Sequence, residues 1–216
     1  MLVDDTPVDK PGTRVRVDAA VRVRGKERRF VSRGGEKLAG ALEDLEIDAT
    51  GWLCLDVGAS TGGFTDCLLQ AGARHVVAVD VGYGQLDLSL RSDPRVTVLE
   101  RTNARALRAE QLPGEVELAT VDVSFISATL ILPRLLEVAP AAPLLVMVKP
   151  QFEVGREQVG KGGVVREDAL REAAFERVAS GAQELGYCPR GRAESRLAGP
   201  KGNREIFLWL GPPGGG

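Results

Sequence analysis

A short apolar run followed by a glycine-rich turn constrains this chain more than any other stretch. Residues 53–57 read as a buried strand with one charged residue, Asp56, near the carboxyl end. Gly58, Gly62 and Gly63 then allow a tight turn and a close approach of the backbone to a ligand. The helix expected next would direct free N–H groups and its positive dipole end into that turn. This pattern is typical of an open α/β sheet, where ligands bind beyond the carboxyl ends of the strands.

The glycine spacing differs from two common nucleotide signatures. The dinucleotide pattern G-x-G-x-x-G fails because Ala59 and Ser60 follow Gly58, and no lysine follows as a phosphate loop requires. An acid before the glycines suits a ligand with a cationic amine, and S-adenosylmethionine carries an amine, a carboxylate and a sulfonium. The alternative is a strand–helix corner that binds nothing.

Apolar runs alternate with helix-forming stretches, which predicts a doubly wound, mostly parallel sheet with helices on both faces. Four strand ends carry an ionisable residue: Asp56, Asp80, Asp122 and Lys149. Because charged groups are costly to bury without partners, we expect a catalytic or binding cleft along that edge. The expected strands are 53–57, 76–81, 96–99, 116–121, 144–148, a segment near Tyr187 and 205–210, and the expected helices are 63–71, 128–138 and 167–185.

The N-terminal part is expected to differ from this pattern. Valines at every second position over 15–23 predict a strand, and 25–29 reads as a basic linker. Near Ser32 or Gly34 a helix can start, and Lys37 would then lie in its first turn, where the dipole disfavours a cation. That placement hints at function, and the alternative is an exposed lysine paired with a nearby acid.

Composition narrows the class of protein. Apolar residues make up 44% and charged residues 27% of 216 residues, as in ordinary globular proteins. No stretch is long and apolar enough to span a membrane, and no signal peptide is apparent. Three cysteines without C-x-x-C spacing suggest reduced thiols in a cytoplasmic protein, and one histidine makes a histidine-based metal site improbable. We therefore expect no metal and no membrane partner.

The net charge of −2 conceals two basic segments. Residues 1–37 carry a net +4 and residues 190–205 a net +3, so the remainder is acidic. These segments could form one patch for an anionic partner, or they could be ordinary solvated surface.

Five motifs in order resemble the TlyA family, ribosomal RNA 2′-O-methyltransferases related to the FtsJ type and also known as haemolysins. The motifs are Phe30-Val31-Ser32-Arg33-Gly34-Gly35-Glu36-Lys37-Leu38, the stretch Asp56 to Asp66, Val121-Asp122-Val123-Ser124-Phe125-Ile126-Ser127, Val148-Lys149-Pro150-Gln151-Phe152-Glu153 and Gly202-Asn203-Arg204-Glu205-Ile206-Phe207-Leu208.

The resemblance implies a Rossmann-like methyltransferase fold of seven strands with an antiparallel last hairpin, and S-adenosylmethionine as cofactor. It implies transfer of a methyl group to a ribose 2′-hydroxyl of ribosomal RNA, with cytidine the expected nucleotide. The implied catalytic tetrad is Lys37, Asp122, Lys149 and Glu205. The implied cofactor-binding residues are Asp56, Gly58, Ser60, Thr61, Gly62, Gly63, Phe64, Asp80, Val81, Asn103 and Asp122. The candidate RNA-binding residues are Arg22, Arg24, Arg28, Arg29, Arg33, Arg190, Arg192 and Arg204.

The resemblance also divides the chain. Family members begin with an S4-type RNA-binding domain, and here residues 1–24 resemble only its end. We therefore expect a truncated S4 remnant and linker over 1–29, a methyltransferase domain over 30–210 and a flexible tail over 211–216. We expect a monomer or a weak homodimer.

The expected chemistry centres on Lys149 and its neighbours. As a cation, Lys149 would stabilise the alkoxide that develops on the 2′-oxygen, and as a neutral amine it could take the proton. Asp122 would orient Lys149, and Glu205 would pair with Lys37. Three other functions stay open: a membrane-active haemolysin, a cofactor-binding and RNA-binding protein without methyltransferase activity, and a nicotinamide dehydrogenase, which the glycine spacing disfavours.

Overall fold

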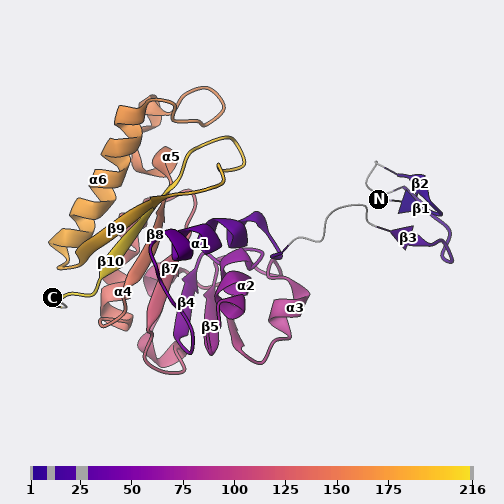
Figure 1. Cartoon of the computed structure of the whole chain (residues 1–216), viewed down its shortest axis with the longest axis horizontal. Coiled ribbons are helices and arrows are strands. Elements are labelled where there is room, and N and C mark those ends of the chain that lie inside the picture. Colours follow the sequence, from indigo (N-terminus) through magenta and orange to yellow (C-terminus); the bar gives the residue numbers. More distant parts are fainter. Residues whose placement is uncertain (1, 9–12, 23–28, 215–216) are drawn as a thin grey trace.

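A seven-stranded sheet with the order β6-β5-β4-β7-β8-β10-β9 carries the fold (Figure 1). The computed structural model describes residues 2–8, 13–22 and 29–214. The strands of this sheet are β4 (Leu53–Val57), β5 (His75–Val79), β6 (Val96–Leu99), β7 (Leu118–Val121), β8 (Leu144–Val148), β9 (Cys188–Glu194) and β10 (Ile206–Gly211). The helices are α1 (Arg33–Asp44), α2 (Gly63–Gln70), α3 (Leu88–Arg91), α4 (Leu132–Val138), α5 (Pro150–Glu153) and α6 (Asp168–Glu184).

The expected doubly wound sheet is confirmed. Strands β4 to β8 pair in parallel, and β10 is antiparallel to both β8 and β9. From β4 the chain moves outward to β5 and β6, and then crosses back to β7 on the other side of β4. The strand order therefore reverses between β4 and β7, which is where an open α/β sheet forms its ligand crevice.

Two apolar cores lie on the two faces of this sheet. Leu55 of β4 belongs to the core that includes α4 and α6, whereas Cys54 belongs to the core with α1 and α2. Since neighbouring residues of a strand face opposite sides, Asp56 faces the α1 and α2 side as well. Burial raises the pKa of Cys54 and of Cys67 to about 12, which keeps both thiols protonated. Their role is packing in the core with α1 and α2.

Helix α1 begins one residue after its N-cap, Ser32, whose Oγ accepts a hydrogen bond from the Gly34 N–H at 3.3 Å. Its first turn carries the acidic Glu36, which suits the positive end of the helix dipole. The expectation that Lys37 lies in the first turn is therefore wrong, because it falls at the start of the second turn. The side chain of Lys37 is instead buried.

The N-terminal residues form a small antiparallel sheet of β1 (Leu2–Val3), β2 (Thr6–Pro7) and β3 (Val21–Arg22). A strand over all of 15–23 is not observed, since residues 13–20 are not in a strand and Val23 lies outside the described residues. The reason is physical: β1 offers two residues for pairing, and Val17 is fully exposed with no apolar face to cover it. Period-two patterning without a partner surface does not make a strand.

Candidate active site

The glycine turn after β4 sits directly against the end of β7. Gly58 has φ +90°, and a Cβ atom there would lie 2.5 Å from the carbonyl oxygen of Asp122. Both facts require glycine, because L residues with side chains rarely adopt this conformation and no side chain would fit. The turn therefore brings the end of β4 into contact with the end of β7. These are the two strands at the switch point, where the strand order reverses.

Asp56, near the end of β4, lies in the protein interior behind this turn. Its side chain is fully buried. The carboxylate accepts a hydrogen bond from Thr65 Oγ1 at 2.7 Å and a longer one from Thr120 Oγ1 at 3.3 Å. Burial raises the pKa of Asp56 to about 7, and the two threonine hydroxyls oppose that rise. Asp56 lines neither of the two cavities described below, so the structure gives it a supporting position in place of the expected ligand contact.

The next two glycines make packing contacts. At Gly63 a Cβ atom would lie 2.2 Å from Ser32 Oγ, so the starts of α1 and α2 can meet only because Gly63 lacks one. At Gly62, φ is +96° and a Cβ would collide with Leu90 of α3. Gly63 lines the larger cavity, whereas Gly62 lines neither.

A cavity of about 310 Å³ opens beside the turn at the ends of β4, β5 and β7. Asp80 follows β5, and its carboxylate accepts hydrogen bonds from the Ser60 N–H at 2.8 Å and the Gly82 N–H at 2.6 Å. Val81 is 70% exposed and lines this cavity, together with Asn103. A carboxylate with free lone pairs and an exposed apolar side chain fit the ribose and base of a nucleoside cofactor. The predicted cofactor residues Gly58, Ser60 and Asp122 line it too.

A larger cavity of about 660 Å³ adjoins the first and shares Gly58, Ser60, Asp122 and other residues with it. All four members of the predicted tetrad line this cavity, as do Thr61 and Phe64. Phe64 stacks on Phe207 of β10, with ring centroids 6.1 Å apart, so the wall of the cavity is fixed by core packing.

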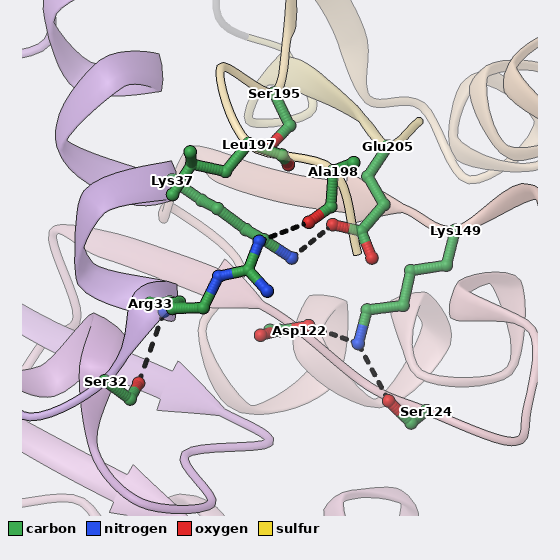
Figure 2. A network of polar contacts seen from close by, with 11 residues as sticks. Ser32, Arg33, Lys37, Asp122, Ser124, Lys149, Ser195, Leu197, Ala198 and Glu205 are labelled. Carbon is green, nitrogen blue, oxygen red and sulfur yellow. Dashed lines mark hydrogen bonds and ion pairs between the residues drawn. The ribbon is translucent and has the colours of Figure 1, made fainter. Parts of the chain in front are cut away.

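The first ion pair of the tetrad is buried. Lys37 Nζ lies 2.5 Å from Glu205 Oε2, with side chains that are 8% and 2% exposed. Arg33, four residues earlier on α1, donates to the Ala198 carbonyl at 2.8 Å. These two contacts attach the first helix of the domain to the loop before its last strand (Figure 2).

The second ion pair joins the ends of β7 and β8. Lys149 Nζ lies 2.5 Å from Asp122 Oδ1 and donates to Ser124 Oγ at 2.8 Å. Burial raises the pKa of the Asp122 carboxyl, and the positive charge of Lys149 opposes that rise. Figure 2 shows the two ion pairs facing the same space, with Asp122 between the two lysines. Two ammonium groups thus border one cavity that opens toward the glycine turn.

Several residues of the larger cavity carried no predicted role, among them Ser124, Phe125, Gln151 and Phe152. Phe125 is 88% exposed with φ +70°, and its ring lies 5.4 Å from that of Phe152. The buried Oε1 of Gln151 has no hydrogen-bond partner in the described part of the chain. All four belong to motifs that carry the resemblance, and their positions shortly after Asp122 and Lys149 are the signal in the sequence that points to them.

The predicted RNA-binding arginines do not form one group. Arg204 directly precedes Glu205 and is exposed, and the exposed Arg33 lines the larger cavity. Arg190 lies at the opposite end of the sheet, because its neighbour Pro189 pairs with Leu210, which pairs in turn with the first residue of β8.

The other predicted arginines are occupied or cannot be placed. Arg192 pairs with Glu172 at 2.8 Å and with Glu194 at 3.4 Å. Arg29 lies over the Phe30 ring at 4.8 Å. Arg22 belongs to β3, and Arg24 and Arg28 lie outside the described residues.

The strand order, the antiparallel β10 and a nucleoside-sized cavity at the switch point define the class, a Rossmann-like methyltransferase fold. Fibrillarin from Aeropyrum pernix, solved with bound S-adenosyl-L-methionine, shares this fold at 14% identity and a TM-score of 0.56, covering 82% of this chain and 76% of that one. Residues 30–212 match the profile of the FtsJ-like methyltransferases. The chain belongs to this family.

Two relatives are much more similar. The 16S/23S rRNA (cytidine-2′-O)-methyltransferase TlyA of Mycobacterium tuberculosis is 54% identical over 210 residues, which cover 96% of this chain and 78% of the relative. A solved structure from Streptococcus thermophilus, named provisionally as a haemolysin, is 40% identical with a TM-score of 0.85, covering 97% of this chain and 75% of that one. Within residues 2–8, 13–22 and 29–214, no helix is long and apolar enough to cross a membrane.

Proposed function

We propose that this protein transfers a methyl group from S-adenosylmethionine to a ribose 2′-hydroxyl of ribosomal RNA, with cytidine as the expected nucleotide. One observation carries the proposal: two lysine–carboxylate pairs border a cavity that adjoins the glycine turn. The TlyA relative named above modifies cytidine in ribosomal RNA, and its high identity supports the same substrate here.

The two cavities have different roles in this proposal. The cavity with Asp80, Val81 and Asn103 holds the nucleoside part of the cofactor, and Gly58, Ser60, Thr61 and Gly63 provide the turn beside it. The larger cavity, beyond Asp122, receives the target ribose. When bound, S-adenosylmethionine supplies an electrophilic methyl group on a sulfonium.

Lys149 has an electrostatic role. Its Nζ donates to Ser124 Oγ and lies opposite the Asp122 carboxylate, and a nearby carboxylate favours the ammonium form of a lysine. An ammonium beside the 2′-oxygen stabilises the negative charge that develops as the O–H bond breaks, with the proton passing to solvent water, and as the oxygen bonds the methyl carbon. Asp122 holds Lys149 in place, and Glu205 holds Lys37 as the second cation of the wall.

The mouth of the larger cavity suits an RNA nucleotide. The exposed ring of Phe125, backed by Phe152, offers a flat apolar surface close to Lys149, and aromatic rings stack with bases that leave a helix. We expect Arg33 and Arg204 to contact RNA phosphates. We expect the reaction to take place in the cytoplasm, carried out by a monomer or a weak homodimer without a metal.

The test is methyl transfer from tritiated S-adenosylmethionine to ribosomal subunits, followed by mapping of 2′-O-methyl positions. We expect the wild type to label one or a few cytidines and Lys149→Ala to lose at least 100-fold in rate, as removal of a charge-stabilising donor does. Lys149→Ala should still bind S-adenosylmethionine in a calorimetric titration. Labelling of a base or of protein, or near wild-type turnover by Lys149→Ala, would contradict the proposal.

A further inference from the structure

Two segments carry the Lys149–Asp122 pair, and a buried carboxylate joins them. Residues 122–128 follow β7, and residues 149–153 follow β8. Glu153, at the end of α5, is 4% exposed. Its Oε2 accepts a hydrogen bond from Ser127 Oγ at 2.5 Å, and its Oε1 accepts one from the Ala128 N–H at 2.8 Å.

This carboxylate is in a costly environment. Burial raises the pKa of Glu153, and the hydrogen bonds from Ser127 and Ala128 oppose the rise. Arg177 donates to the backbone carbonyl of Glu153 at 3.2 Å, not to its carboxylate. Ser127 is already the N-cap of the turn η3 (Ala128–Leu130), since its Oγ accepts from the Thr129 N–H at 3.2 Å. Capping alone therefore does not account for a buried glutamate at this place.

The same two segments meet twice more, closer to the cavity. Lys149 contacts Asp122 and Ser124, and Phe152 contacts Phe125. Phe125 holds φ +70°, a conformation that costs free energy for a bulky residue and persists only where the surroundings enforce it. Glu153 lies at the buried base of this set of contacts and fixes Ser127, two residues after Phe125.

We propose that Glu153 is a positioning residue for methyl transfer: it fixes the segment after β7 against the segment after β8, so that Asp122, Ser124 and Phe125 stand correctly around Lys149. The proposal rests on the proposed function for its kinetic consequence. It assigns Glu153 no contact with substrate or cofactor.

The kinetic test uses Glu153→Ala, Glu153→Gln, Ser127→Ala and the double variant Glu153→Ala/Ser127→Ala. We expect Glu153→Ala to lower kcat at least tenfold, with the Kd for S-adenosylmethionine within twofold of wild type. Glu153→Gln keeps an acceptor for Ala128 and a group that reaches Ser127, so it should restore most of the rate. The double variant should be no slower than Glu153→Ala, because both changes break one contact. Glu176→Gln, an exposed acid on α6, is the matched control.

Hydrogen–deuterium exchange tests the same proposal without activity. Glu153→Ala should increase exchange in residues 122–130 and 149–154, and leave α1 and β4 unchanged. Unchanged exchange, additive kinetic effects in the double variant, or loss of cofactor affinity in step with kcat would overturn the proposal. If the wild type methylates no RNA while Glu153→Ala still loosens both segments, the proposed function fails and the positioning contact stands. If Glu153→Ala does not fold, Glu153→Gln and Ser127→Ala carry the same comparison.

Discussion

Lys149 and Asp122 follow neighbouring parallel strands and meet at 2.5 Å, although 27 positions separate them in the sequence. The register of β7 against β8 determines this contact, since Val121 pairs with Val146 and both strands end at the same edge of the sheet. Ser124 adds a second acceptor for the lysine at 2.8 Å. The cation is thus held by two groups on one loop.

This arrangement predicts graded effects of changes around Lys149. Asp122→Asn removes the charge that holds the ammonium and should lower kcat by about 100-fold, whereas Ser124→Ala removes one hydrogen bond to a charged group and should lower it by about tenfold. Single-turnover rates with saturating cofactor measure both. Equal effects of the two changes would mean that Asp122 does not act through its charge.

The buried pair Lys37–Glu205 should be far more important to stability than a surface pair. Lys37→Met leaves the Glu205 carboxylate buried without its cation and should cost about 3 to 5 kcal/mol of unfolding free energy. Lys37→Met/Glu205→Leu removes both charges and should recover most of that loss while staying inactive. Urea denaturation and methyl transfer, measured on the same samples, separate the two effects. Arg74→Met, which breaks an exposed pair with Glu117, provides the surface comparison.

Asp56 should make stability depend on pH in an unusual direction. Its pKa is about 7 in the folded protein against a reference of 3.8, so the folded state holds the proton more tightly than the unfolded state. That stabilising contribution is complete at a pH below 3.8 and is lost as the pH rises through 7. Asp56→Asn lacks the titration. Between pH 5 and pH 8, the free energy of unfolding of Asp56→Asn should therefore rise by roughly 3 kcal/mol relative to that of the wild type.

Denaturation curves of wild type and Asp56→Asn at several pH values check this expectation. Asp48→Asn is a suitable control, because hydrogen bonds from Thr50 lower the pKa of that exposed carboxyl and its trend runs the other way. A constant difference between Asp56→Asn and wild type from pH 5 to pH 8 would show that Asp56 is not protonated near neutral pH.

The arginines should differ in their contribution to RNA binding according to their place in the sheet. Arg204→Ala lies beside the tetrad and should weaken RNA binding and reduce the slope of log affinity against log salt by about one unit. Arg190→Ala, at the far end of the sheet, should change neither. Filter binding of ribosomal RNA at a series of salt concentrations measures the slopes. The same loss of slope for both variants would place RNA across the whole β9 edge.

The sequence predicted the doubly wound sheet, and the four residues that it proposed as a tetrad line one cavity of the structure. The predictions that failed did so for structural reasons. Asp56 was expected to contact a ligand because it ends a strand before glycines. Both faces of a parallel sheet are apolar, so the sequence does not show that Asp56 faces the buried α2 side. Arg190 was grouped with Arg204 by sequence distance, but it lies near the start of β9, and only the end of β9 reaches the edge of the sheet that carries the site. The predicted strand over 15–23 was wrong because β1 offers only two residues for pairing.

The Lys37–Glu205 pair joins two residues that the ribosome adds to the chain at very different times. The two residues stand 168 positions apart, on the first helix of the domain and just before its last strand. A chain that stops short of residue 205 already contains the glycine turn, Asp80 and the Lys149–Asp122 pair, yet it leaves an ammonium with no carboxylate to receive it. Glu205 and the residues just before β10 complete the wall of the larger cavity, so we expect a chain that stops before residue 205 to lack methyl-transfer activity.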